Sequence, residues 1–172
     1  CIYLVGLSGS GKSTITQYLY NKLREIDTRT ITILDGDVVR HNLSKGLGFS
    51  REDRSTNVRR IGYVASEIVK HGGICICANI APYEDDRKNN RMRIGRNYVE
   101  IYLNTKLETC EERDIKGLYK LARDGVIKEF TGISDVFEIP KNSELILDGS
   151  NYNNIEKNVD EIIKYLSKEL LV

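Results

Sequence analysis

The chain has 172 residues and carries 26 lysine or arginine side chains against 25 aspartate or glutamate side chains, a formal net charge of +1. This length suits one domain with one sizeable hydrophobic core. The balance of charge excludes a general attraction to nucleic acid or to an anionic membrane, and the apolar runs are far shorter than the roughly 20 residues that cross a bilayer. We therefore predict a single domain, residues 1–172, with neither nucleic acid nor a membrane among its partners.

The first predicted element is a buried strand, Ile2–Val5, followed directly by the sequence GLSGSGKST and by a helical pattern at residues 13–25. This is the G-x-x-x-x-G-K-[ST] phosphate loop in its strand-to-helix context. Its glycines allow backbone N–H groups to turn inward around an anion, and the helix adds its positive N-terminal end. The predicted nucleotide-binding residues are Gly6, Leu7, Ser8, Gly9, Ser10, Gly11, Lys12, Ser13 and Thr14.

Two side chains of this loop are expected to contact the phosphates and the metal ion. Lys12 is expected to reach the β and γ phosphates of a triphosphate, and the Ser13 hydroxyl is expected to complete the coordination shell of Mg²⁺. A glycine-rich turn alone can be purely structural, but lysine and serine at the required offsets favour phosphate binding.

The next apolar segment, residues 30–34, predicts a second strand, and Asp35-Gly36-Asp37 follows it. Two carboxylates therefore lie at the carboxyl end of a strand, on the same edge as the phosphate loop. Phosphoryl transfer to a hydroxyl requires a group that orients and deprotonates that hydroxyl and a group that organises Mg²⁺. Asp35 and Asp37 can fill both roles, and the sequence does not assign the roles individually. Without a phosphate loop, an Asp-Gly-Asp sequence is usually just a turn or a helix cap.

Residues 53–71 show apolar residues at helical spacing and predict a helix. On it, Arg54 and Asn57 are three residues apart and share a face. Arg54 can form a forked contact with a phosphate or sulfate, Asn57 can add a neutral donor, and Phe49, which precedes the helix, can stack on a base. Taken singly, each of these residues is better explained by a solvated basic helix with a phenylalanine in the core.

The remaining segments continue the alternation of strands and helices. Strands are predicted at residues 74–80, Val99–Leu103 and Leu145–Leu147, and helices at residues 84–98, 105–113, 116–124 and 154–171. Such alternation is typical of an α/β protein with three layers, here a mainly parallel, five-stranded sheet with helices on both faces. Ligands of such sheets bind at the carboxyl ends of the strands.

The four cysteines are Cys1, Cys75, Cys77 and Cys110, and none forms a C-x-x-C pair. We expect buried free thiols, which fit a reducing cytoplasm. Two histidines without clustered His/Cys spacing argue against a zinc site.

The chain resembles adenylylsulfate kinase over nearly its whole length. Besides the phosphate loop, the resemblance rests on DGDVVRHNL (35–43), LGFSREDRSTNVRRIG (47–62), PYEDDR (82–87), RDIKGLYKLARDG (113–125) and FTGISDVFEIP (130–140), several of which are specific to that family. The resemblance implies the phosphate-loop kinase fold and the transfer of a phosphoryl group from MgATP to the ribose 3′-hydroxyl of adenosine 5′-phosphosulfate. It also suggests a homodimer.

The family also implies roles for residues around the acceptor. Phe49 and Phe130 are expected to sandwich the base of the acceptor, and Arg40, Arg54 and Asn57 to hold its phosphate and the neighbouring anionic group. With Lys116 added, the predicted acceptor-binding residues are Arg40, Phe49, Arg54, Asn57, Lys116 and Phe130.

The same resemblance implies a helical lid at about residues 116–132 that closes over both nucleotides, and it places Arg113 against the base of ATP. A lid is physically reasonable, because a kinase that admits water to its site hydrolyses ATP.

Some residues depart from the family pattern. Many members read Phe-Ile-Ser-Pro where this chain reads Asn79-Ile80-Ala81-Pro82. The serine has been proposed to carry phosphate transiently in some members; Ala81 cannot do so, but direct in-line transfer from ATP needs no such serine.

These departures cluster near the expected acceptor pocket, and two alternatives follow. A related branch phosphorylates cytidine diphosphoramidate in capsule biosynthesis, and aromatic stacking tolerates different bases. A nucleotide-dependent switch is a more remote alternative, because residues 104–108 and 114–117 resemble guanine-reading and D-x-x-G motifs, but in the wrong order.

Overall fold

The structure is a computed structural model that describes residues 1–169. Its sheet has five parallel strands in the order β2-β3-β1-β4-β5. Their bounds are β1 Ile2–Val5, β2 Ile31–Asp35, β3 Ile74–Asn79, β4 Val99–Leu103 and β5 Leu145–Leu147. The predicted five-stranded parallel sheet is confirmed, with strand ends displaced by one residue at most in β2 and β3.

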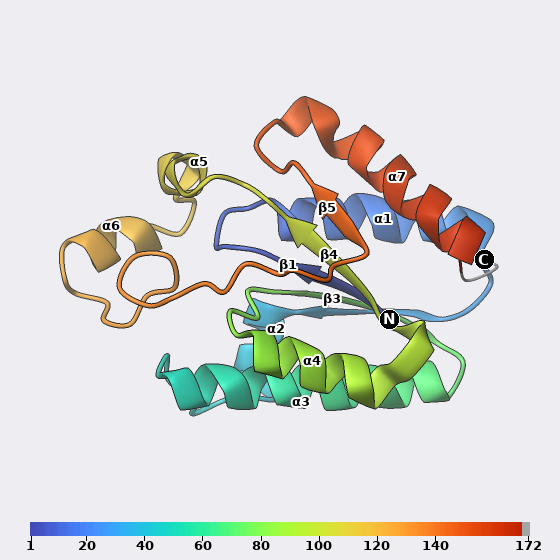
Figure 1. The fold of residues 1–172 in the computed structure, drawn as a ribbon, viewed down its shortest axis with the longest axis horizontal. Coiled ribbons are helices and arrows are strands. Elements are labelled where there is room, and N and C mark those ends of the chain that lie inside the picture. Colours follow the sequence, from blue (N-terminus) through green and yellow to red (C-terminus); the bar gives the residue numbers. More distant parts are fainter. Residues whose placement is uncertain (170–172) are drawn as a thin grey trace.

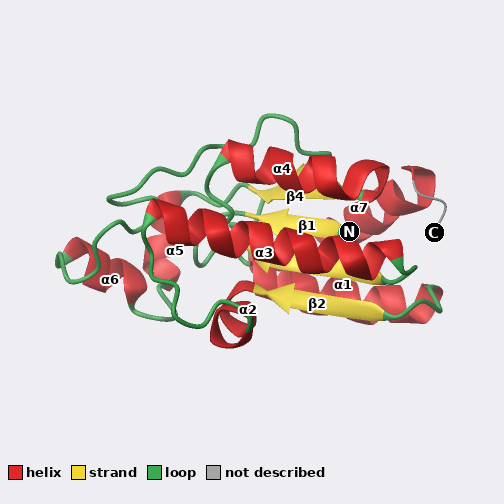
Figure 2. Cartoon of the chain, turned by 90° about the horizontal axis from the view of Figure 1, so that it is seen from below, coloured by secondary structure: helices red, strands yellow, loops and turns green. Residues whose placement is uncertain are grey.

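Helices cover both faces of the sheet, as predicted. Figure 1 shows α1 and α7 on one face, α3 and α4 on the other, and α5 and α6 beyond the carboxyl ends of the strands; Figure 2 shows the same layers from below. The helices are α1 Lys12–Ile26, α2 Gly36–Asn42, α3 Arg51–Lys70, α4 Glu84–Ile94, α5 Leu107–Arg113, α6 Leu118–Arg123 and α7 Ile155–Glu169, with 3₁₀ turns at Gly95–Asn97 and Tyr152–Asn154.

Helix α2 was not predicted from the sequence, because seven residues carry too short a periodic pattern. It begins where the Asp35 side chain accepts a hydrogen bond of 3.0 Å from the backbone N–H of Asp37, an ordinary N-cap. The predicted helix at residues 84–98 ends instead at Ile94, since Gly95 adopts a φ of +71° and the chain continues as a 3₁₀ turn. Of the predicted helix at residues 154–171, residues 170 and 171 lie outside the described part.

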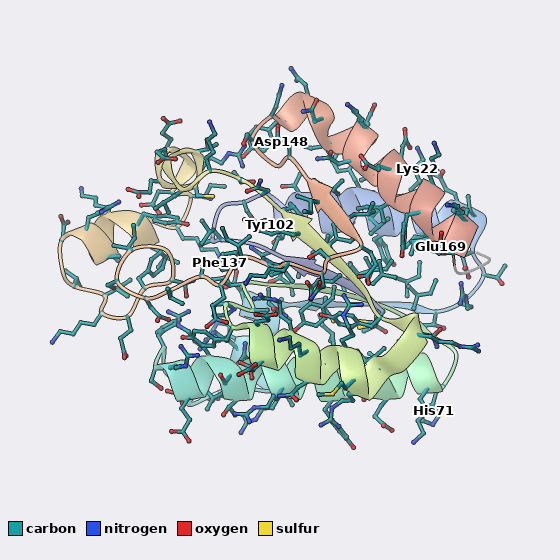
Figure 3. All side chains as sticks on the ribbon, in the orientation of Figure 1. Lys22, His71, Tyr102, Phe137, Asp148 and Glu169 are labelled. Carbon is teal, nitrogen blue, oxygen red and sulfur yellow. The ribbon has the colours of Figure 1, made fainter. Side chains whose placement is uncertain are left out.

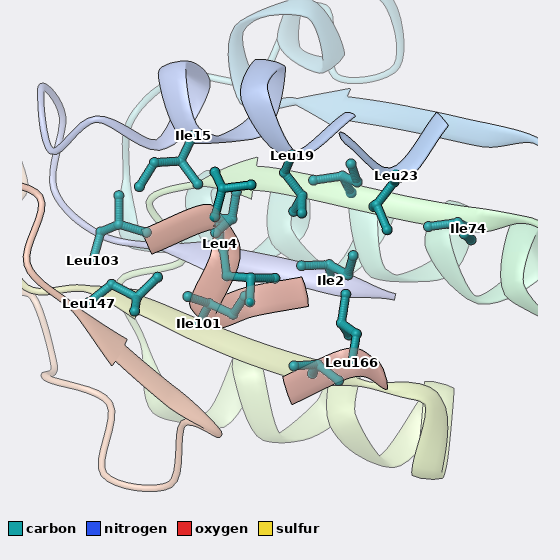
Figure 4. Close-up of a cluster of buried hydrophobic side chains, with 14 residues drawn as sticks. Ile2, Leu4, Ile15, Leu19, Leu23, Ile74, Ile101, Leu103, Leu147 and Leu166 are labelled. Carbon is teal, nitrogen blue, oxygen red and sulfur yellow. The ribbon is translucent and has the colours of Figure 1, made fainter. Parts of the chain in front are cut away.

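Alternating residues of the strands face two different hydrophobic cores. Ile2 and Leu4 of β1 point to α1 and α7, whereas Tyr3 and Val5 point to α3 and α4. Figure 4 shows the first core, which consists of Ile2, Leu4, Ile15, Leu19, Leu23, Ile74, Ile76, Val99, Ile101, Leu103, Leu147, Val159, Ile162 and Leu166. Both cores run along the central strands, so the sheet holds the carboxyl ends of β1, β2 and β3 in fixed positions.

The segment that follows the predicted lid, residues 133–144, contacts β4. The ring of Tyr102 stacks on that of Phe137 with centroids 5.9 Å apart (Figure 3).

The cysteines of the described chain are free thiols, as predicted. Cys75, Cys77 and Cys110 are buried, but Cys1 is partly exposed because β1 begins only after it. Among residues 1–169, no helix combines the length and the apolar character needed to cross a membrane.

Candidate active site

The phosphate loop joins β1 to α1 at the carboxyl edge of the sheet. Gly9 and Gly11 adopt φ angles of +74° and +99°, a region that favours glycine. A side chain at Gly9 would also press on the Cys110 carbonyl oxygen, which lies 3.1 Å from the position of a Cβ atom. The loop sequence is thus explained by backbone conformation as well as by phosphate chemistry.

Three side chains from distant parts of the chain hold the carbonyl groups of this loop. The Thr105 hydroxyl donates to the Ser10 carbonyl at 2.9 Å, Arg113 donates to that of Gly9 at 3.0 Å, and the Tyr119 hydroxyl donates to that of Ser8 at 2.8 Å. The Ser10 N–H donates to the Leu7 carbonyl at 3.2 Å, whereas those of Gly9, Gly11 and Lys12 have no backbone partner in the described chain and remain available for an anion.

The Lys12 ammonium group donates to the carbonyl oxygens of Gly6 and Leu7 at 2.9 and 2.7 Å and to the Ser10 hydroxyl at 3.3 Å. Burial lowers the pKa of Lys12 to about 8 from its ordinary 10.5. A triphosphate would compensate the positive charge far better than these neutral acceptors do.

Ser13 and Asp35 form the oxygen pair that a magnesium site requires. The Ser13 hydroxyl donates to the Asp35 carboxylate at 3.0 Å. Mg²⁺ bound with a nucleotide keeps several waters and phosphate oxygens, so it needs only one or two protein oxygens. The donor set therefore fits Mg²⁺. No cluster of three or more His, Cys, Asp or Glu side chains that could hold a metal ion occurs among the described residues, and a nucleotide-bound Mg²⁺ does not need one.

Asp37 has different neighbours. Its carboxylate lies in direct contact with the Lys116 ammonium group at the start of the lid, and 69% of its side chain is exposed. Asp35 is thus bonded to Ser13, while Asp37 faces the lid across the opening of the site.

A cavity of about 620 Å³ connects the phosphate loop with the lid, within the usual range for small-molecule sites. All the predicted catalytic and acceptor-binding residues line it, as do residues 8–14 of the phosphate loop. Of the predicted site residues, Gly6, Leu7 and Arg113 do not line it; the carbonyls of Gly6 and Leu7 accept from Lys12, and Arg113 donates to the Gly9 carbonyl. These assignments remain predictions, since geometry alone does not establish a role.

The acceptor side of the cavity is built around Phe49, which is 52% exposed. The guanidinium groups of Arg40 and Arg54 lie 4.5 and 5.4 Å from the centre of its ring. Arg40 donates to the Gly48 carbonyl at 2.8 Å, and Arg54 to that of Phe49 at 2.8 Å. Burial lowers the pKa of both guanidinium groups, so an anion placed beside them would gain charge-assisted hydrogen bonds.

The lid shares a small hydrophobic core with α5. The rings of Tyr119 and Phe130 meet edge to face with centroids 5.0 Å apart, and Cys110 and Ala122 pack with them. Its far end is bonded to α3, because Arg54 donates to the Glu129 carbonyl at 2.7 Å. Phe130, only 6% exposed, is therefore held in the cavity wall by packing.

Arg113 lies beside a ring that sequence reasoning missed. Its guanidinium group is 4.6 Å from the centre of the Tyr152 ring and donates to the carbonyls of Gly149 and Ser150 at 2.9 and 2.7 Å. Tyr152 is 53% exposed and lines the cavity. No sequence signal marks it, because its position depends on how the loop after β5 returns to the phosphate loop.

Two further residues without a predicted role line the cavity. Asn79, at the end of β3, is one of the departures from the family pattern that were expected near the acceptor pocket. Tyr119 lies within the lid sequence, and only its contacts with Ser8 and Phe130 reveal its place in the site.

A family model and a related sequence both match this chain to adenylylsulfate kinase. The sequence model of the family described as adenylylsulphate kinase matches residues 1–148. The adenylyl-sulfate kinase of Rippkaea orientalis is 49% identical over 177 aligned positions, which cover 99% of this chain and 96% of that protein.

Solved structures agree with the sequence relatives. The structure of the Mycobacterium tuberculosis APS kinase CysC in complex with AMPPNP and APS superposes with a TM-score of 0.88 and 37% identity, covering 96% of each chain. A hexameric APS kinase from Thiobacillus denitrificans gives a TM-score of 0.72 at 37% identity and covers 98% of this chain but 28% of that one.

Proposed function

This chain belongs to the adenylylsulphate kinase family, and from that premise we propose that it transfers the γ-phosphoryl group of ATP to the ribose 3′-hydroxyl of adenosine 5′-phosphosulfate. The single observation that carries the proposal is the cavity that joins Lys12, Ser13 and Asp35 to Arg40, Phe49 and Phe130. One end has the groups that a triphosphate needs, and the other has an aromatic ring with two cations for an anionic nucleotide.

In the proposed reaction the 3′-hydroxyl oxygen attacks the γ-phosphorus in line, the bond to the β-phosphate oxygen breaks, and ADP leaves. We assign the proton of the hydroxyl to Asp37, because Asp35 is already bonded to Ser13 and caps α2. Lys12 would carry the charge of the β and γ phosphates. Mg²⁺, held by Ser13 and Asp35, would supply further charge neutralisation.

The acceptor is proposed to lie between Phe49 and Phe130, with its anionic groups near Arg40, Arg54 and Asn57. Lys116 can change partner from Asp37 to the acceptor when the lid, residues 116–132, closes. The Arg113 guanidinium group and the ring of Tyr152 offer a flat surface for the base of ATP.

We further propose that residues 1–172 act as one domain, in the cytoplasm, where ATP and free thiols coexist. A homodimer is the proposed assembly. Support for self-association comes from the hexameric relative; light scattering of the purified chain measures the assembly directly.

The test measures ADP release with MgATP and adenosine 5′-phosphosulfate, with cytidine diphosphoramidate, and with no acceptor. We expect ADP release to require an acceptor and kcat/KM to be greatest for adenosine 5′-phosphosulfate, since that ratio reports discrimination directly. Higher kcat/KM for the cytidine compound would reject the proposed acceptor. Equal ADP release without any acceptor would reject the kinase itself in favour of a hydrolase or switch.

A further inference from the structure

Asn79 is the last residue of β3 and lies between the two halves of the site. It pairs with Val5, directly before the phosphate loop, and its neighbour Ala78 pairs with Asp35. Gly36 packs so closely on it that a Cβ atom there would lie 3.2 Å from the Asn79 Cβ. Asn79 lines the cavity, yet it is only 6% exposed.

The Asn79 amide belongs to a buried chain of hydrogen bonds. The Tyr3 hydroxyl lies 3.0 Å from one end of this amide and 3.2 Å from the Asn90 amide nitrogen. The Asn90 nitrogen also donates to the Val58 carbonyl at 3.2 Å. The chain therefore runs from α3 through α4 and β1 to the cavity wall at the end of β3.

The orientation of Asn90 follows from its partners. A backbone carbonyl can only accept, so the end of Asn90 that faces Val58 must be the nitrogen. That same nitrogen donates to Tyr3. The Tyr3 hydroxyl is thus an acceptor from Asn90, and its one proton needs an acceptor elsewhere.

That proton decides the orientation of Asn79. With the Asn79 nitrogen turned to Tyr3, the Asn79 oxygen has no partner and the Tyr3 proton has none either. Because the two ends of an amide are nearly the same size, the network must assign them. Turning the amide over lets Tyr3 donate to the Asn79 oxygen. Burial raises the pKa of Tyr3 well above its ordinary value, so the hydroxyl keeps this proton.

We infer that Asn79 presents its amide N–H groups to the acceptor nucleotide, donating to a phosphate or ribose oxygen, and that it is a specificity-determining residue of this kinase. The inference rests on the proposed function, because it needs a nucleotide in the cavity. In this orientation two amide N–H donors take the place of the buried oxygen that has no partner, and a buried donor left unsatisfied is costly. A bound oxygen would remove that cost, so an acceptor that offers such an oxygen is preferred.

The experiment compares four variants of the full chain by steady-state kinetics with MgATP and adenosine 5′-phosphosulfate. Asn79→Asp keeps an oxygen for Tyr3 and replaces the donors with an anionic oxygen, while Asn79→Leu removes all hydrogen bonding. Tyr3→Phe releases the amide from its orientation. Tyr98→Phe is the matched control, because Tyr98 is another buried tyrosine of the same core, whose hydroxyl bonds to Glu100 at 3.1 Å and which does not line the cavity.

We expect Asn79→Asp and Asn79→Leu to raise the KM of the acceptor about tenfold or more, and Tyr3→Phe to raise it about threefold, with the KM of ATP within about twofold of wild type. Tyr98→Phe should leave both KM values unchanged. Melting curves identify a variant that fails to fold; if Asn79→Leu does so, Asn79→Asp and Tyr3→Phe carry the test.

An unchanged KM of the acceptor in Asn79→Asp, with an active wild type, would overturn the inference. Equal increases in both KM values would also overturn it, since they indicate general damage to the site. No acceptor-dependent ADP release by the wild-type chain would instead mean that the proposed function has failed, and this outcome is visible before any variant is measured.

Discussion

The two faces of the sheet have different compositions. The core between the sheet and helices α1 and α7 consists of isoleucine, leucine and valine. The core under α3 and α4 contains aliphatic residues too, but also Tyr3, two cysteines and, beside them, the buried amides of Asn79 and Asn90. Leu4 and Tyr3 are neighbours on β1 and belong to different cores.

This difference has a physical consequence. Burial of aliphatic groups is non-directional, so the α1 and α7 face can supply stability without fixing any one side chain near the ligand. Buried amides and hydroxyls require particular partners, so the α3 and α4 face fixes the orientation of groups at the cavity wall. We therefore expect stability and substrate recognition to be separable by mutation.

Of these substitutions, Lys12→Ala should reduce activity most while leaving stability almost unchanged. We expect turnover to fall by about a thousandfold, because the variant loses the cation on the transferred phosphoryl group. The fold should persist, since the ammonium group is bonded only to Gly6, Leu7 and Ser10 of its own loop. Activity assays with melting curves measure both; near-normal turnover would refute the assigned role of Lys12.

The two aspartates should differ from each other. Asp37→Asn is expected to lower kcat by about 100- to 10,000-fold with little change in ATP affinity, because it removes the proposed general base. Asp35→Asn should instead raise the Mg²⁺ concentration needed for half-maximal rate. A Mg²⁺ titration of both variants decides the assignment, and the reverse pattern would exchange the two roles.

Leu4→Ala tests whether the core under α1 and α7 contributes to stability without affecting substrate binding. Leu4 is fully buried among aliphatic side chains, so its truncation should reduce the free energy of unfolding by about 2–5 kcal/mol. Both KM values, measured below the unfolding transition, should match those of the wild type. Denaturant titration gives the first quantity, and a selective change in one KM would show that the two faces are not separable.

Phe49→Ala should weaken acceptor binding by about 1–3 kcal/mol through the loss of one stacked ring. ATP binding should change far less, because Phe49 lies on the acceptor side of the cavity. Calorimetric titration with each nucleotide measures the two affinities. Equal losses for both would contradict the placement of the acceptor base beside Phe49.

The smallest expected effect is a pH dependence of ATP binding. Lys12 has a pKa of about 8 in the free chain, so it loses its proton as the pH rises above that value. Bound phosphates favour the charged form, so binding takes up a proton, and affinity should fall by up to about tenfold per pH unit above pH 8. Calorimetry in buffers of different ionisation enthalpy detects the uptake, which should vanish in Lys12→Ala.

The lowered pKa of Lys12 has the opposite effect on the stability of the nucleotide-free chain, which should increase as the pH rises. The unfolded chain retains the Lys12 proton up to about its ordinary pKa of 10.5, whereas the folded chain releases it near 8. Between these values the unfolded state binds more protons, so this residue makes the folded state more stable as pH rises. The difference in unfolding free energy between wild type and Lys12→Ala reports it.

Much of the architecture could be predicted because its signals are local. The strand bounds of β1, β4 and β5 were predicted without error, and the phosphate loop follows from backbone requirements at Gly9 and Gly11 together with Lys12. Helix α2 and the early end of α4 were missed, since a short helix and a single glycine leave little periodicity to detect.

The sequence by itself determined the sheet, its helical layers and the chemistry of the phosphate loop, because hydrophobic period and fixed residue offsets act over a few neighbouring residues. Only the tertiary structure decided which side chains from distant segments meet. Tyr119 reaches Ser8, Tyr152 reaches Arg113, and Tyr3 reaches Asn79. Such contacts depend on how helices, loops and strands pack together, and hydrogen bonds between them are directional, so no local pattern in the chain records them.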